Sequence, residues 1–216
     1  MLSGRFFTLA IALFGACGND TGMGDDVETP PEETDGAKLF AENCANCHGP
    51  SGEGTLADGP QIQNPVRAFA TYVIRNGRGK EMGFAQEMEP LAAADLSDAQ
   101  LKSILDFLSA APHPTTGQSL YLRFCGNCHG ADAHGGRVEE GVASGESDEI
   151  DEKVREGHGG TNYASRTKYM PAWSSAELTK IEVDLIKAYL GALPPGPGDD
   201  DDDDDDDNDG ETDEAI

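Results

Sequence analysis

Two copies of a five-residue pattern constrain this chain more than any other feature. The sequence reads C-A-N-C-H at 44–48 and C-G-N-C-H at 125–129, so both copies have the form C-x-x-C-H. Two thiols on one helical turn can each form a thioether with a vinyl group of a porphyrin, and the histidine that follows can then bind the iron. Thioredoxin-like redox pairs and zinc sites also use C-x-x-C, but no additional C-x-x-C pair is present to complete a zinc site. The pattern therefore predicts two covalently attached haem c groups.

The motifs assign the first set of site residues. We expect four cysteines to form thioethers and two histidines to bind iron on the proximal side: Cys44, Cys47, His48, Cys125, Cys128 and His129. The fifth cysteine of the chain, Cys17, lies far upstream in a different kind of segment.

The similarity between the two halves extends beyond the motifs. The sequence V-I-R-N-G at 73–77 matches K-V-R-E-G at 153–157, and L-S-D-A-Q at 96–100 matches L-T-K-I-E at 178–182. The chain therefore contains two units, about 36–112 and 113–195. Each unit is too small to bury a large core by itself, so a central haem would supply much of the missing apolar contact.

Each unit is predicted to be helical, with about three helices and long loops around one haem. The first helix leads into the motif, the second spans about 66–76 or 148–156, and the third begins at a capping box, S-x-x-Q at 97–100 or T-x-x-E at 179–182. The third helix continues with apolar residues at helical spacing. In the second unit we expect those residues to be Ile181, Leu185, Ile186 and Tyr189. No segment alternates with period two, so we expect little or no sheet.

Two methionines are predicted to bind iron on the opposite face. Methionine and histidine are the usual sixth ligands of such haems. Met170 lies eight residues before Leu178, and Met88 lies eight residues before the matching Leu96. Met82 lies fourteen residues before Leu96 and breaks this register, so we assign Met88 and Met170 and keep Met82 as the alternative in the first unit.

The two C-x-x-C-H motifs, the repeated segments and the two methionine segments resemble class I cytochrome c, doubled as in di-haem cytochromes of the c4 type. The resemblance covers residues 36 to about 195. It implies an all-α fold of two tandem domains. It also implies that a proline carbonyl accepts the N–H of the proximal histidine. Pro60 stands where that proline would be for His48, whereas no proline lies between His129 and Met170. We therefore expect the second unit to lack or replace this contact.

The N-terminal residues have the features of an export signal. A positive residue, an apolar run and small residues precede Cys17, and the run is too short to span a bilayer. The sequence L-F-G-A-C at 13–17 resembles the lipobox of bacterial lipoproteins. We expect residues 1–16 to be a signal peptide and Cys17 to carry lipid, with 17–35 as a disordered acidic tether. The protein would then lie on the periplasmic side of a bacterial membrane.

The charge of the chain limits its partners. The formal net charge is −26, and half of it lies in a tail at 196–216 that contains nine consecutive aspartates. Such a tail is expected to be disordered and to attract cations only loosely. A nucleic-acid partner is excluded because it would require a basic surface. We expect redox proteins with a basic docking patch instead.

These observations predict an exported, lipid-anchored electron carrier that is not itself an enzyme and takes no small-molecule substrate. An alternative is a di-haem peroxidase or a sulfur-compound dehydrogenase, or the cytochrome subunit of one. A haem-based sensor is a third possibility. Both alternatives require an iron with an open or displaceable position, which two methionine ligands would not leave.

Overall fold

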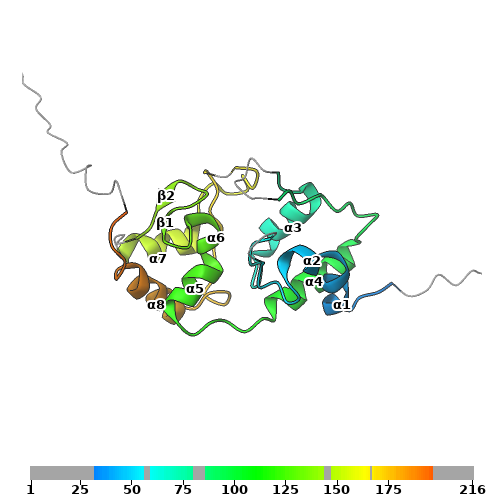
Figure 1. Cartoon of the computed structure of the whole chain (residues 1–216), viewed down its shortest axis with the longest axis horizontal. Coiled ribbons are helices and arrows are strands. Elements are labelled where there is room, and N and C mark those ends of the chain that lie inside the picture. Colours follow the sequence, from blue (N-terminus) through cyan, green and yellow to red (C-terminus); the bar gives the residue numbers. More distant parts are fainter. Residues whose placement is uncertain (1–31, 56–58, 80–85, 144–146, 166, 197–216) are drawn as a thin grey trace, which may run out of the picture. The chain divides into compact units, whose positions relative to one another are not determined.

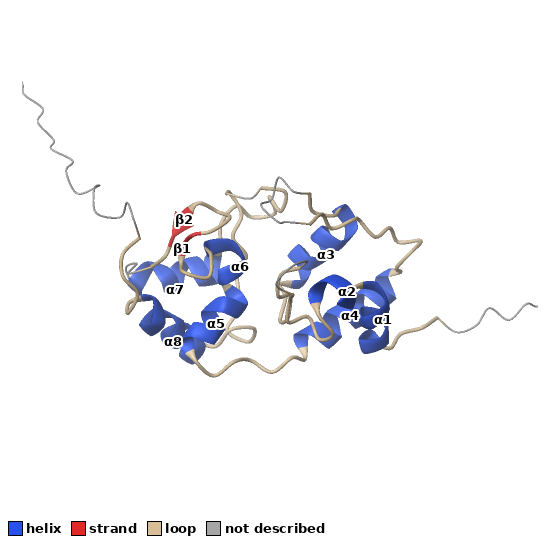
Figure 2. Cartoon of the chain, viewed as in Figure 1, coloured by secondary structure: helices blue, strands red, loops and turns tan. Residues whose placement is uncertain are grey.

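The computed structural model describes residues 32–55, 59–79, 86–143, 147–165 and 167–196, and most of its regular structure is helical (Figures 1 and 2). The predictions for the signal peptide, Cys17, Met82 and the acidic tail from 197 onward lie outside the described residues. The described part contains two sets of helices that follow one another along the chain.

Four helices lie among the described residues of the first unit. They are α1 (Gly36–Asn43), α2 (Ala45–His48), α3 (Arg67–Asn76) and α4 (Asp98–Ser109). The Asp35 carboxylate accepts hydrogen bonds from the backbone N–H groups of Ala37 and Lys38, which fixes the start of α1. In the first C-x-x-C-H motif, Cys44 is the residue between α1 and α2, and the other four residues form the whole of α2.

The second unit repeats this order. Its helices are α5 (Gly117–Phe124), α6 (Gly126–His129), α7 (Ser147–Glu156) and α8 (Lys180–Leu190). The one sheet among the described residues is a ladder of two-residue strands, β1 (His134–Gly135) and β2 (Glu140–Gly141). The prediction of an all-helical chain with little sheet is confirmed, and this short ladder is the part that no sequence pattern indicated.

Each unit has its own hydrophobic core. In the first unit α1 packs on α4, and in the second α5 packs on α8. The two helices of each pair can approach closely because α1 and α5 both begin with glycine. A Cβ on Gly36 would lie 2.1 Å from the Ser103 carbonyl oxygen, and one on Gly117 would lie 2.1 Å from the Leu185 carbonyl oxygen. The most deeply buried side chains are Phe40, Leu96, Ile104, Leu120, Tyr121, Leu178, Val183 and Ile186.

The buried face of α8 differs from the one we expected. Ile181 is 73% exposed and Leu185 is 38% exposed, whereas Val183, Ile186 and Leu190 are buried. These three residues lie 82 positions after Leu101, Ile104 and Leu108 of α4, which are buried as well. The prediction for Ile181 and Leu185 was wrong because several apolar stripes fit helical spacing on α8, and only the repeat register selects the buried one.

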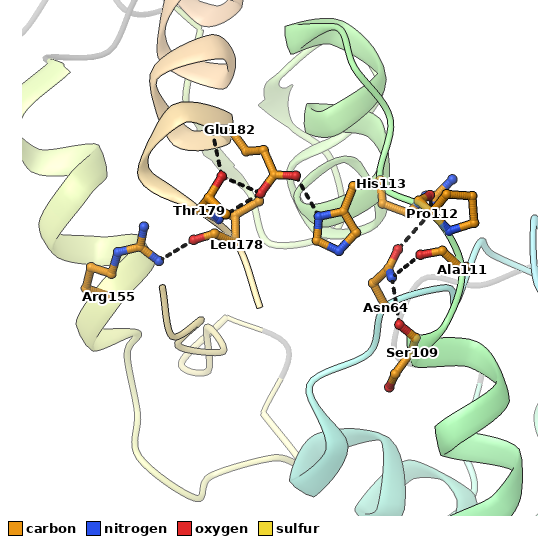
Figure 3. Close-up of polar contacts among 10 residues, drawn as sticks. Asn64, Ser109, Ala111, Pro112, His113, Arg155, Leu178, Thr179 and Glu182 are labelled. Carbon is orange, nitrogen blue, oxygen red and sulfur yellow. Dashed lines mark hydrogen bonds and ion pairs between the residues drawn. The ribbon is translucent and has the colours of Figure 1, made fainter. Parts of the chain in front are cut away.

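The two capping boxes predicted for the third helices are both present. The Ser97 hydroxyl accepts from the Gln100 N–H while the Gln100 side chain accepts from the Ser97 N–H, and Thr179 and Glu182 do the same at α8. The Glu182 carboxylate also accepts a hydrogen bond from His113 Nδ1 at 2.7 Å, as Figure 3 shows. The segment that joins the two units is thereby attached to the start of α8.

Candidate functional site

The first motif places His48 against a backbone carbonyl. His48 Nδ1 lies 2.9 Å from the Pro60 oxygen. A carbonyl can only accept, so Nδ1 carries the proton and Nε2 has its lone pair available. A metal-binding histidine is commonly oriented by such a hydrogen bond on its other nitrogen. The resemblance implied this contact for Pro60, and the structure places the two groups at bonding distance.

The second motif has the same contact with a different residue. His129 Nδ1 lies 2.9 Å from the Glu140 carbonyl oxygen. Glu140 belongs to β2, which pairs with β1 just after the motif. The proline that the sequence lacks here is therefore replaced by a backbone carbonyl of a short hairpin. No residue type could have revealed this replacement, because the group that accepts the hydrogen bond belongs to the main chain.

Met88 and Met170 occupy the same backbone position in their units. Arg78 and Met88 exchange two backbone hydrogen bonds of 2.8 and 2.9 Å, and His158 and Met170 exchange two of 2.9 and 3.0 Å. The two methionines thus lie in matching isolated bridges. This match agrees with the spacing that favoured Met88, while Met82 lies outside the described residues.

A glycine before each bridge makes the close approach possible. Gly77 and Gly157 have φ values of +74° and +65°. A Cβ on Gly77 would lie 2.5 Å from the Met88 oxygen, and one on Gly157 would lie 2.6 Å from the Met170 oxygen. Both the left-handed backbone and the absent side chain are therefore required for the bridge.

Two arginines hold the chain that follows each methionine. Arg75 Nη1 donates to the Leu91 oxygen at 2.9 Å, and Arg155 Nη1 donates to the Trp173 oxygen at 2.9 Å. Arg155 Nη1 also donates to the Leu178 oxygen. These arginines were not among the site residues predicted above. The signal was available, because Arg75 and Arg155 are the shared arginines of the matching segments at 73–77 and 153–157.

The first-unit residues predicted for haem share one cavity of about 520 Å³. Cys44, Cys47, His48, Pro60 and Met88 all line it. Its volume lies within the usual range for cofactor sites, roughly 300–1,000 Å³. Of the predicted second-unit residues, Cys128 lines the same cavity, whereas Cys125 and Met170 pack against the hydrophobic core of the second unit.

Three of the four motif cysteines have sulfurs that are poorly solvated. Burial raises the pKa of Cys44 to about 11 and that of Cys125 to about 12. Burial also raises the pKa of Cys128. Burial therefore favours the neutral form of these three sulfurs, and the sulfur of a thioether is also neutral.

Trp173 is a further sign that a group belongs in this cavity. Its side chain lines the cavity and packs edge-on against Phe124, next to the second motif. Its buried indole Nε1 has no hydrogen-bond partner among the described residues. Such unsatisfied donors are rare in folded proteins. The residues that line the cavity thus fit a large, mainly apolar cofactor.

A family model described as "Cytochrome C oxidase, cbb3-type, subunit III" matches the chain twice, at residues 31–108 and 112–190. The chain belongs to this family. Its fold is two tandem cytochrome c domains, as predicted, and it carries two covalently bound haem c groups. Among the residues that the structure describes, no helix is both long enough and apolar enough to cross a membrane.

Curated relatives of this family member are oxidase subunits. A cbb3-type cytochrome c oxidase subunit CcoP of Rubrivivax gelatinosus is 27% identical over 175 residues, and the match covers 73% of this chain and 53% of the relative. A cbb3-type subunit FixP of Azorhizobium caulinodans is 26% identical over 197 residues, covering 78% and 64%. The chain therefore spans about half to two thirds of the length of these relatives.

One solved structure was also found to be similar. It is the reduced recombinant cytochrome c4 from Pseudomonas stutzeri, at 16% sequence identity and a TM-score of 0.28, with 74% of this chain and 97% of that chain covered.

Proposed function

We propose that this di-haem cytochrome is an electron carrier that passes single electrons between redox protein partners. The observation that supports this most is that both units pair a C-x-x-C-H motif with a methionine in the same backbone bridge. The proposed iron ligands are His48 with Met88 and His129 with Met170. The proposed thioether cysteines are Cys44, Cys47, Cys125 and Cys128.

The proposed ligand sets suit electron transfer. Haem c supplies an iron that alternates between the ferrous and ferric states. The chain's own residues then have three tasks: to occupy both axial positions, to fix each histidine tautomer and to exclude water. The carbonyls of Pro60 and Glu140 fix the tautomers, and the bridges at Met88 and Met170 hold the methionines. Filled axial positions leave no place for a substrate, which disfavours the peroxidase, dehydrogenase and sensor alternatives.

The location we propose is the periplasmic side of a bacterial membrane. The signal-like residues 1–16 and the lipobox-like segment ending at Cys17 support export and lipid anchoring. We also propose that the domains are 36–112 and 113–195, with 17–35 as a tether and 196–216 as an acidic tail. Partners would present a basic patch to this acidic chain.

The relatives favour a second candidate. Both are subunits of cbb3-type oxidases. The chain could therefore deliver electrons within a larger oxidase rather than diffuse between complexes. Copurification with an oxidase, after mild solubilisation of native membranes, distinguishes an assembled subunit from a separate carrier.

Absorption spectroscopy tests the carrier proposal. The ferric holoprotein should show a methionine-sulfur-to-iron charge-transfer band from both haems, and the ferrous form should not take up carbon monoxide readily. Rapid uptake of carbon monoxide by one haem would refute the carrier role for that unit.

Three single variants test the ligand assignment. Met88→Ala should remove the band of the first haem and Met170→Ala that of the second, while Met82→Ala should leave both bands in place. Loss of a band in Met82→Ala, with Met88→Ala unchanged, would show that Met82 is the ligand.

A further inference from the structure

Four aromatic rings meet where the first unit contacts the second. Phe69 and Tyr72 belong to α3 of the first unit, whereas Tyr163 and Tyr169 belong to the segment of the second unit that leads to Met170. The ring centres of Phe69 lie 4.9 Å from those of Tyr169 and 6.0 Å from those of Tyr163. Tyr163 in turn lies 5.4 Å from Tyr72 and 5.0 Å from Tyr169, again between ring centres. Aromatic pairs attract at about 4.5–7 Å, so these residues form one group, which we call the aromatic cluster.

The α-helix of the second unit that matches α3 has no rings at these positions. In the register of the repeat, Glu149 and Glu152 of α7 correspond to Phe69 and Tyr72 of α3. Both glutamates are exposed, whereas both rings are half-buried. An acidic side chain thus stands wherever the matching helix face meets solvent, and a ring stands where α3 meets the other unit.

The methionine segments follow the same rule. Tyr169 directly precedes Met170 and is half-buried, while the residue directly before Met88 is Glu87, which is exposed. The rings are therefore a property of the contact between the units and not of the repeated fold.

The aromatic cluster contacts both segments that hold the proposed methionine ligands. On the side of the first unit, the guanidinium carbon of Arg78 lies 4.9 Å from the centre of the Phe69 ring, and the backbone of Arg78 pairs with that of Met88. On the side of the second unit, Tyr169 is bonded directly to Met170. The contact between Phe69 and Tyr169 therefore joins the two methionine bridges through packed side chains.

The second unit presents its two rings on a closed loop. The backbone bridge between His158 and Met170 closes this loop, and the rings of Tyr163 and Tyr169 pack edge-on within it. A loop that is closed at its base loses less conformational entropy when its side chains are ordered against another surface. The two tyrosines therefore meet α3 as a preformed surface.

The central pair of the aromatic cluster also borders the proposed haem sites. Phe69 and Tyr169 line the cavity of about 520 Å³, together with His48 of the first motif and Cys128 of the second. The same two rings that join the methionine bridges thus lie beside residues of both motifs. A change in how these rings pack would alter the placement of one site against the other.

We propose that the aromatic cluster positions the two haem sites for transfer of an electron between them. The inference rests on the proposed carrier function. In this transfer one ferrous iron becomes ferric while the other, ferric, iron becomes ferrous, so the chain neither gains nor loses an electron and no proton has to move. The rate depends steeply on how the two sites are placed. The four aromatic residues are thus positioning residues that act through the methionine segments.

Nuclear magnetic resonance exchange spectroscopy of the half-reduced holoprotein tests this proposal. Exchange within one molecule is independent of protein concentration, whereas exchange between molecules slows on dilution. Tyr169→Leu and Phe69→Leu each remove one ring of the central pair, and the intramolecular rate constant should fall about tenfold in each. The methionine-to-iron bands should persist. If Tyr169→Leu disturbs the neighbouring Met170, Phe69→Leu decides the result, because it lies far along the chain from both proposed methionine ligands.

Two variants serve as matched controls. Tyr169→Phe keeps the ring and removes the hydroxyl, so it should retain the intramolecular rate constant. Tyr189→Leu removes a tyrosine ring whose centre lies 5.6 Å from that of Tyr121, within the second unit. It should lower the stability of that unit and leave the rate constant unchanged.

Denaturant unfolding gives a second readout that does not depend on electron transfer. Phe69 and Tyr169 are in contact, so the loss of one ring should matter less once the other is gone. The unfolding equilibrium constant of the double variant should differ about two- to tenfold from the value that additivity gives. Phe69→Leu combined with Tyr189→Leu should be additive, because these residues belong to different ring pairs.

Three outcomes would overturn the proposal. One is an unchanged intramolecular rate constant in both Tyr169→Leu and Phe69→Leu. Another is an equal fall in Tyr189→Leu, which would trace the effect to lost stability. The third is a fall in Tyr169→Phe as large as that in Tyr169→Leu, which would assign the effect to the hydroxyl. In each case intact methionine bands would leave the carrier function standing, whereas bands absent from the unsubstituted protein would remove the function itself.

Discussion

The two units build the same proximal contact from different residues. In the first, His48 donates to the Pro60 oxygen within a loop, and in the second, His129 donates to the Glu140 oxygen within a two-stranded hairpin. The distances are equal although the sequences do not match. The difference shows that the histidine requires a backbone carbonyl at one position. Residues of different types can supply that carbonyl, because it belongs to the main chain.

The third helices show the opposite relation, with matching positions and different chemistry. Gln100 and Glu182 both close a capping box, but only Glu182 can ionise. Leu105 is buried in α4, while the matching position in α8 holds Lys187, which pairs with Asp151 of α7. At these two positions the second unit uses charged groups where the first uses neutral ones.

Core truncation should give the largest effects and should be the same in both units. Ile104 and Ile186 are each 1% exposed, so Ile104→Ala and Ile186→Ala should each lower the free energy of unfolding by about 2–5 kcal/mol. Ile181→Ala should change it by about 0.5 kcal/mol or less, because Ile181 is largely exposed. Denaturant unfolding of the holoprotein measures all three. Equal losses for Ile181 and Ile186 would contradict the register that relates α4 to α8.

Substitution of the glycines before the methionines should come next in size. Gly77→Ala and Gly157→Ala should each cost about 1–2 kcal/mol for the left-handed backbone, plus the contact with the methionine carbonyl. Each should remove the methionine-to-iron band of its own unit only.

The control for these glycines is Gly160→Ala. Gly160 has a φ of +60°, but a Cβ there would meet no atom within 4 Å. It should therefore cost stability and keep both bands. Loss of both bands in Gly77→Ala would show that the units do not hold their methionines independently.

Acid should separate the two capping boxes. Burial raises the pKa of Glu182, but hydrogen bonds from Thr179 and His113 lower it, and the net pKa is below the usual 4.5. A lowered folded pKa means that the contribution to stability is present above about pH 4.5 and is lost as the pH falls through the folded value. The cap contributes about 1 kcal/mol.

Amide hydrogen exchange at low pH measures this difference. Protection of α8 should fall relative to that of α4 as the pH decreases below 4.5. In Glu182→Gln that pH dependence should disappear, because the glutamine matches the neutral Gln100 of α4. A parallel decline of α4 and α8 in both proteins would argue against a role for Glu182.

The smallest effect should come from Pro60→Ala. His48 donates to the backbone oxygen of Pro60, which alanine also provides. The midpoint potential of the first haem should stay the same, and the free energy of unfolding should fall by about 1 kcal/mol or less through the added freedom of the unfolded chain. A large drop in potential would mean that the proline ring, rather than the carbonyl, positions the histidine.

Much of this architecture could be predicted from the sequence because the chain contains it twice. The spacing from Met170 to Leu178 recurs from Met88 to Leu96, and the structure places both methionines in matching bridges. The contact of His129 with Glu140 could not be predicted, because a main-chain acceptor leaves no mark on the residue type.

The backbone bridge at each methionine has a consequence for how such proteins diversify. Arg78 with Met88, and His158 with Met170, are joined by main-chain hydrogen bonds that do not involve the methionine side chains. The backbone at Met88 and Met170 is thus held without any contribution from the side chain at that position. A single substitution at position 88 or 170 would exchange or remove the proposed axial ligand of one haem while the backbone hydrogen bonds of the bridge remain possible. A chain with two such units can therefore change the proposed ligand of one haem while the other unit keeps its own.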